Sequence, residues 1–116
     1  MTQPGMGSEN GQFTSELAAF PDQANVPNDD LLHKALFDWA TVHNNLPGDV
    51  NHAGLLDDNN PVDREIRLKF ETTSGAISDR LKDLGFVDVY FADKYVRFSG
   101  NPDKRNYPDG HFTARD

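Results

Sequence analysis

A stripe of apolar residues between positions 31 and 43 constrains the fold most strongly. Its members recur at steps of three and four, which is the spacing of one face of an α-helix. Asn28 is the predicted N-cap and Pro47 ends the pattern, so we expect a helix at 29–44. Burial contributes about 1.5 to 3 kcal/mol per large side chain, which favours a core-facing stripe over a ligand surface. The stripe consists of Leu31, Leu32, Ala35, Leu36, Trp39, Ala40 and His43.

Two segments near the C-terminus alternate apolar and polar residues, which is the pattern of half-buried β-strands. A two-residue turn at Asp93 and Lys94 joins them into a hairpin over 86–99. This register places the large aliphatic side chains on one face, whereas a slip by one residue would expose Val96 and Phe98. The expected pairs are Phe91 with Val96, Tyr90 with Arg97, and Val89 with Phe98, and the outer face then carries Tyr90, Tyr95 and Arg97.

The segment between the first helix and the hairpin fits two secondary structures. In one interpretation, Asn60 caps a helix over 62–70. In the other, residues 64–72 form a strand, because apolar and charged residues alternate there. In both, Ser74 caps a helix over 75–84. The competing apolar sets are Val62, Ile66 and Phe70 for the helix, and Ile66, Leu68 and Phe70 for the strand.

The two ends of the chain differ in composition from the part between them. Residues 1–12 contain no aromatic or β-branched apolar residue, so we expect a disordered acidic and polar arm at 1–28. The turn-forming residues beyond Gly100 predict an irregular C-terminal tail at 101–116. A single globular domain at 29–100 remains between the two ends.

The order of elements over residues 62–99 resembles the winged helix-turn-helix superfamily. The residues that carry the resemblance are Ile66, Phe70, Thr73, Ile77, Leu81 and Leu84, followed by a wing from Phe86 to Phe98. Two positions depart from the superfamily pattern, since Arg67 stands where such motifs usually place Ala and Glu71 where they usually place Gly.

The resemblance implies a small α+β winged-helix-like domain. Its elements would be a supporting helix at 29–44, helices at 62–70 and 75–84, and a β-hairpin at 86–99. If residues 64–72 form a strand instead, the fold is a two-layer α-β-α-β-β domain.

Charge is unevenly distributed along the chain. Ten of the eleven Lys and Arg residues follow Pro61, whereas nine acidic residues precede Pro61 and ten follow it. The first half therefore carries about −8 and the second is about neutral. Because binding partners respond to local charge, an acidic chain can still present a nucleic-acid surface on its second half.

The composition also limits the compartment and the chemistry. There is no cysteine, which excludes disulfides, thiolate metal sites and cysteine nucleophiles. No apolar run approaches the roughly 18 to 20 residues needed to cross a bilayer, and the sequence does not begin with a secretory signal. We therefore expect a cytoplasmic protein.

Catalytic and metal-binding motifs are missing from the sequence. Neither a glycine-rich phosphate loop nor a G-x-S-x-G elbow occurs. His33 and His43 would lie about 15 Å apart along one helix, too far to share a metal ion. We expect no catalytic residue, no metal, no cofactor and no small-molecule ligand.

The expected function is that of a small non-catalytic regulatory protein that binds a partner protein or a larger assembly. Its interface candidates are the outer-face hairpin residues Tyr90, Tyr95 and Arg97, since aromatic and arginine side chains are enriched at interface hot spots. One alternative is a DNA-binding winged helix of the transcription-regulatory type. Another is an acidic mimic of nucleic acid that inhibits a nucleic-acid-binding protein. The candidates for DNA contact are Ser78, Arg80, Lys82, Lys94 and Arg97.

Overall fold

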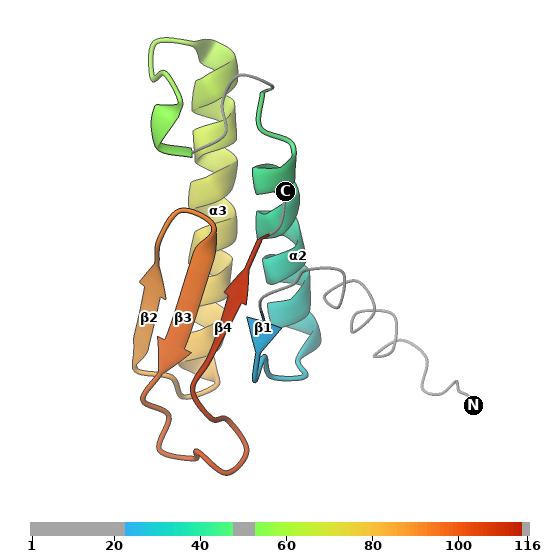
Figure 1. Cartoon of the computed structure of the whole chain (residues 1–116), viewed down its shortest axis with the longest axis vertical. Coiled ribbons are helices and arrows are strands. Elements are labelled where there is room, and N and C mark those ends of the chain that lie inside the picture. Colours follow the sequence, from blue (N-terminus) through green and yellow to red (C-terminus); the bar gives the residue numbers. More distant parts are fainter. Residues whose placement is uncertain (1–22, 48–52, 115–116) are drawn as a thin grey trace, which may run out of the picture.

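Two helices cover one face of a four-stranded antiparallel sheet (Figure 1). This computed structural model describes residues 23–47 and 53–114. The expected mixed α+β class is confirmed, whereas the winged-helix assignment of residues 62–99 is not confirmed. In chain order the elements are β1 (Gln23–Ala24), α2 (Asp30–Asn44), the 3-10 turn η1 (Ala53–Leu55), α3 (Pro61–Asp83), β2 (Asp88–Phe91), β3 (Tyr95–Ser99) and β4 (Gly110–Thr113).

The first helix agrees with its prediction except at the cap. Asp29, not Asn28, is the N-cap of α2, because its backbone is extended and its side chain accepts a hydrogen bond of 2.9 Å from the Leu32 N–H. The expected arm at 1–28 also needs a correction. Its first 22 residues lie outside the described residues, but Gln23 and Ala24 form β1.

Helix α3 is continuous over 23 residues, so the predicted break between helices 62–70 and 75–84 is wrong. The alternative strand at 64–72 is also wrong, since these residues are helical. The hydroxyls of Thr72 and Thr73 donate to the carbonyl oxygens of Leu68 and Lys69 at 3.0 and 2.9 Å. The polar residues near the expected turn therefore satisfy their hydrogen bonds inside the helix and do not end it.

The C-terminal end of α3 is closed by a glycine in a left-handed conformation. Gly85 has a φ of +106°, and its N–H donates to the Lys82 carbonyl while the Phe86 N–H donates to the Leu81 carbonyl. These two bonds form a Schellman motif. The buried side chain of Asn101 donates a further bond of 2.8 Å to the Leu84 carbonyl, so the helix end is satisfied by its neighbours.

The sheet has the strand order β1-β4-β3-β2. The three predicted hairpin pairs between β2 and β3 are all present. The predicted irregular tail at 101–116 is wrong at 110–113, because these residues form β4 and pair with both β3 and β1. Gly110 on β4 lies very close to the backbone of β1, since an added Cβ would be 2.3 Å from the Ala24 carbonyl oxygen.

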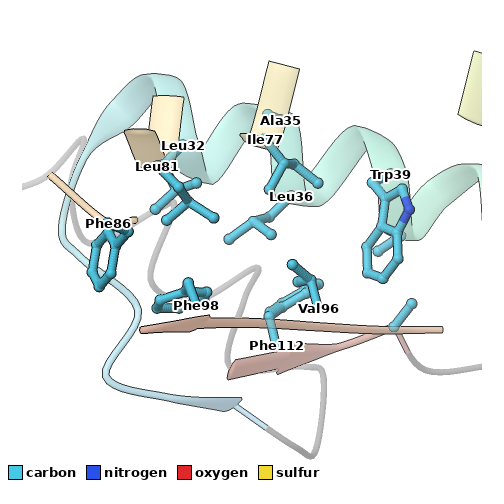
Figure 2. Packing of buried hydrophobic residues seen from close by; sticks show 12 residues of the cluster. Leu32, Ala35, Leu36, Trp39, Ile77, Leu81, Phe86, Val96, Phe98 and Phe112 are labelled. Carbon is cyan, nitrogen blue, oxygen red and sulfur yellow. The ribbon is translucent and has the colours of Figure 1, made fainter. Parts of the chain in front are cut away.

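The hydrophobic core lies between the helices and the sheet (Figure 2). Helix α2 contributes the largest share, which agrees with its predicted apolar stripe, except that Leu31 is 63% exposed. Helix α3 contributes side chains near its C-terminal end, while the strands contribute alternate residues. The fully buried large side chains are Leu32, Leu36, Trp39, Ile77, Leu81, Phe86, Val96, Phe98 and Phe112.

Candidate functional site

The face of the sheet opposite the helices carries aromatic and cationic side chains. Val96, Phe98 and Phe112 point into the core, so the residues that alternate with them point away from the helices. The pairing of β2 with β3 and of β3 with β4 places Tyr90, Arg97 and His111 in one row across three strands. We call Tyr90, Tyr95, Arg97 and His111 the open sheet face.

Ring contacts join these four side chains in pairs. The Arg97 guanidinium carbon lies 5.2 Å from the centre of the Tyr90 ring, which is within the range of a cation–π interaction. The rings of Tyr95 and His111 are stacked, with centroids 5.7 Å apart and planes 27° from parallel. Tyr90 remains 53% exposed. The structure thus brings all three predicted protein-interface residues together on one face.

His111 is the member of the open sheet face that the sequence analysis missed. Its strand was expected to be irregular tail, so no neighbour could be assigned to it. A signal was present, because His111 and Thr113 alternate with the apolar Phe112 and Ala114 directly after a turn-forming Pro-Asp-Gly segment. The pattern was too short to predict a strand by itself.

The five candidates for DNA contact do not share a surface. Ser78, Arg80 and Lys82 lie on α3, Lys94 lies in the β2–β3 turn, and Arg97 lies on the open sheet face. Arg80 is engaged elsewhere, since its Nε and Nη2 donate to the two carboxylate oxygens of Asp29 at 2.9 and 2.7 Å. The structure therefore separates the positive charges that a phosphate backbone would need together.

The Asp29–Arg80 pair is a structural contact between the two helices. The Arg80 guanidinium holds the pKa of the Asp29 carboxyl below its usual value, and the Leu32 N–H adds to this effect, although burial opposes it. Asp29 thereby caps α2 and binds α3 with the same carboxylate. This double role explains why Arg80 is a poor candidate for a ligand contact.

A pocket of about 340 Å³ opens near the β2–β3 turn, with Trp39, His43 and Phe70 among its lining residues. His43 is buried there, and its ring lies 4.7 Å from that of Trp39 and 4.4 Å from that of Phe70. Two polar side chains that line the pocket form hydrogen bonds with backbone groups of the same chain. Arg67 donates to the Leu56 carbonyl at 3.1 Å, and Asp93 accepts from the Ala53 N–H at 3.1 Å.

The described residues contain neither a group that could hold a metal ion nor a helix that could span a membrane. Within 23–47 and 53–114, no three His, Asp or Glu side chains gather in a group that could hold a metal ion. His52 lies outside the described residues. Across the same ranges, no helix has both the length and the apolar content that crossing a bilayer requires.

No family model, no curated protein and no solved structure matches this chain. The candidate site consists of one cation–π pair and one stacked ring pair, contributed by three adjacent strands, on the side of the sheet away from the helices.

Proposed function

We propose that this protein is a small non-catalytic interaction module that binds a partner protein through its open sheet face. The observation that carries the proposal is the position of Tyr90, Tyr95 and Arg97 together on one face, joined by His111. Tyrosine and arginine are the residue types that most often contribute large binding energies at protein interfaces. Tyr90 lies on β2, Tyr95 and Arg97 lie on β3, and His111 lies on β4, so the surface needs no loop to fold around the partner.

The ring contacts support binding by limiting the motion of long side chains. Arg97 would lose rotational freedom on binding, but its position over Tyr90 already restricts it. Stacking does the same for Tyr95 against His111. Since immobilising a long side chain costs about 0.5 to 1.5 kcal/mol, this ordering before binding favours affinity. The Arg97 guanidinium keeps planar donors that suit a carboxylate or carbonyl group of the partner.

The two alternatives have less support. For a DNA-binding winged helix, the proposed recognition residues would have to act from the C-terminal end of the long helix α3, and Arg80 would have to leave Asp29. For an acidic mimic of nucleic acid, carboxylates would have to form a regular array. Asp29 and Asp38 instead pair with cations of the same protein, and Asp57 accepts a bond from Asn59 in its own turn.

Site-specific photo-cross-linking tests the proposal. A photoreactive amino acid in place of Tyr90 should form adducts in cell extract, and these should disappear when Arg97→Ala is added. The same photoreactive group at Lys104, an exposed position outside the open sheet face, serves as the matched control. Protease should destroy the adducts and nuclease should leave them unchanged.

Three results would overturn the proposed function. Adducts that form equally from positions 90 and 104 would show that the open sheet face has no preference. Adducts that survive Arg97→Ala would exclude that side chain from the interface. Adducts destroyed by nuclease would move the protein to the nucleic-acid alternative. Circular dichroism of the Arg97→Ala chain would show that its fold is intact.

A further inference from the structure

The side of the helical layer away from the sheet contains a groove between α2 and α3. Two hollows of about 350 and 530 Å³ lie between these helices, one beside residues 31–38 and 76–83 and the other beside residues 38–42 and 65–73, and Asp38 lines both. We call the two hollows together the interhelical groove. Its lining residues are Leu31, Lys34, Ala35, Asp38, Thr41 and Val42 from α2, and Glu65, Leu68, Lys69, Thr72, Thr73, Ala76, Asp79, Arg80 and Asp83 from α3.

Apolar side chains of both helices are exposed in the groove, between the charged and hydroxyl side chains that also line it. Leu31 and Leu68 are 63% and 61% exposed, although leucine is among the side chains most often buried. Ala35 and Ala76 are small, which leaves the hollow between the helices. The lining threonines each donate their hydroxyl to a carbonyl of their own helix, so they add no unsatisfied donor to the groove: Thr41 to Phe37, Thr72 to Leu68 and Thr73 to Lys69.

Negative charge is in excess along the groove, because two of its cations already form ion pairs with carboxylates. Lys34 binds Asp38 at 3.1 Å, and Arg80 binds Asp29 at 2.7 Å. Within the described residues, Glu65 and Asp79 have no ion pair, and Lys69 is the cation that remains to oppose them. The surface thus combines exposed apolar groups with surplus negative charge.

We infer that the interhelical groove binds a basic amphipathic helix of a partner protein. The groove residues of both helices recur at steps of three and four, so a third helix laid along them would meet a matching repeat. From Leu31 to Val42 the groove extends about 16 Å along α2, which corresponds to about three turns of a bound helix. Lys or Arg residues beside its apolar stripe would face Glu65 and Asp79.

Charge argues against two other occupants. The segment at 13–20 has apolar residues at helical spacing, but Glu16 and Asp22 accompany them and no cation precedes Lys34. A second copy of the chain would bring a further net charge of −8. The first would place Glu16 near Glu65 and Asp79, and the second would have to approach against repulsion between two acidic chains, whereas a basic helix would neutralise the groove.

The test uses the full chain, isotope-labelled for NMR, and a synthetic leucine/lysine peptide of about four helical turns. We expect the peptide to shift the amide resonances of Leu31, Leu68 and Ala76. Asp79→Lys should raise the Kd roughly three- to tenfold, as expected for losing and reversing one exposed ion pair. Glu71→Lys is the matched control, since it makes the same charge change on another face of α3 and should alter the Kd less than about twofold.

Other outcomes would overturn the inference. Equal loss of affinity in Asp79→Lys and Glu71→Lys would indicate attraction to the net charge alone, as would equal binding of a leucine/glutamate peptide. Resonance shifts confined to the open sheet face would place the peptide elsewhere. The chain has no cysteine, so a spin label can be attached at Ser15→Cys. Broadening of the Leu68 and Ala76 resonances by that label would identify the chain's own segment as the occupant, and a concentration-dependent dimer would identify a second copy.

Discussion

The two halves of α3 are held in place by different forces. In the C-terminal half, Ile77 and Leu81 have no exposed surface and pack between α2 and the sheet (Figure 2). The N-terminal half extends past the end of the sheet (Figure 1), and Leu68 on it is 61% exposed. This half buries the carboxylate of Asp63 and half-buries Phe70, which packs against the core. One helix thus combines an apolar anchor at its end with polar attachment at its start.

The polar attachment joins the N-terminal half of α3 to the segment before it. Asp63 accepts a hydrogen bond of 2.8 Å from the Asp57 N–H. Arg67 donates to the Leu56 carbonyl at 3.1 Å and pairs with the exposed carboxylate of Asp58 at 2.7 Å. Exposed ion pairs contribute about 0 to 1 kcal/mol, much less than burial of a leucine. The N-terminal half should therefore open locally at a lower free energy than the C-terminal half.

The largest expected effect comes from removing the apolar anchor. Leu81→Ala should lower the free energy of unfolding by about 2 to 5 kcal/mol, because it removes buried methyl groups and leaves a cavity. The same substitution at Leu68, on the exposed side of the same helix, should change it by less than about 0.5 kcal/mol. Urea denaturation measures both. Equal losses at the two positions would remove the distinction between the halves.

Removing the polar attachment should have a smaller and more local effect. Asp63→Ala leaves the Asp57 N–H without its acceptor, which should cost about 1 to 2 kcal/mol. Amide hydrogen exchange should accelerate over 61–70 while the amides around Leu81 stay protected. The control is Glu65→Ala, which truncates an exposed carboxylate two residues away. Faster exchange throughout α3 would show that the helix opens as a single unit.

The difference between the halves explains which parts of the fold could be predicted from sequence. Helix α2 and the register of the hairpin could be predicted, because their large apolar side chains are buried. Any other register, or a strand in place of the helix, would expose these side chains. The start of α3 is barely buried, so its apolar residues did not distinguish a helix from a strand. Leu68 completed the strand pattern, yet it is exposed in the helix. Ser74 resembled a cap but lies inside α3.

The part of the candidate site that lies on the hairpin could be predicted from the sequence, whereas the part on β4 could not. Tyr90, Tyr95 and Arg97 share a face because the hairpin register follows from neighbouring residues. His111 joins them only through the pairing of β3 with β4, which closes after an intervening loop. Local periodicity carries no information on such a contact. For the same reason, the salt bridge between Arg80 and Asp29, 51 positions apart, was missed.

Lowering the pH should weaken the contact between Asp29 and Arg80 that joins the C-terminal half of α3 to α2. The pKa of Asp29 in the folded chain is lowered, mainly by Arg80, so its ionised form stabilises the fold. That contribution is fully present above the unfolded pKa of about 3.9 and is lost as pH falls through the lower folded pKa.

The comparison is between the parent chain and Asp29→Asn. The variant keeps an oxygen that can cap α2 but has no titrating group at this position. Thermal unfolding of the variant should depend less on pH below about 4. Identical pH profiles would show that this contact does not contribute to acid sensitivity.

The smallest expected effect lies at the boundary between the two halves. Gly75 is helical, and an added Cβ would meet no atom within 4 Å. Glycine inside a helix costs about 1 kcal/mol relative to alanine, so Gly75→Ala should raise the free energy of unfolding by about 0.5 to 1 kcal/mol. Whether alanine in place of glycine stabilises or destabilises the fold depends on the local space, since Gly110→Ala would place its Cβ 2.3 Å from the Ala24 carbonyl oxygen and should destabilise the fold.

If the N-terminal half opens separately, hydrogen exchange over 61–70 should slow in Gly75→Ala, because alanine makes the helix harder to interrupt at the boundary. Unchanged exchange there would mean that opening starts from the contacts of Asp63 and Arg67, and that the boundary has no part in it.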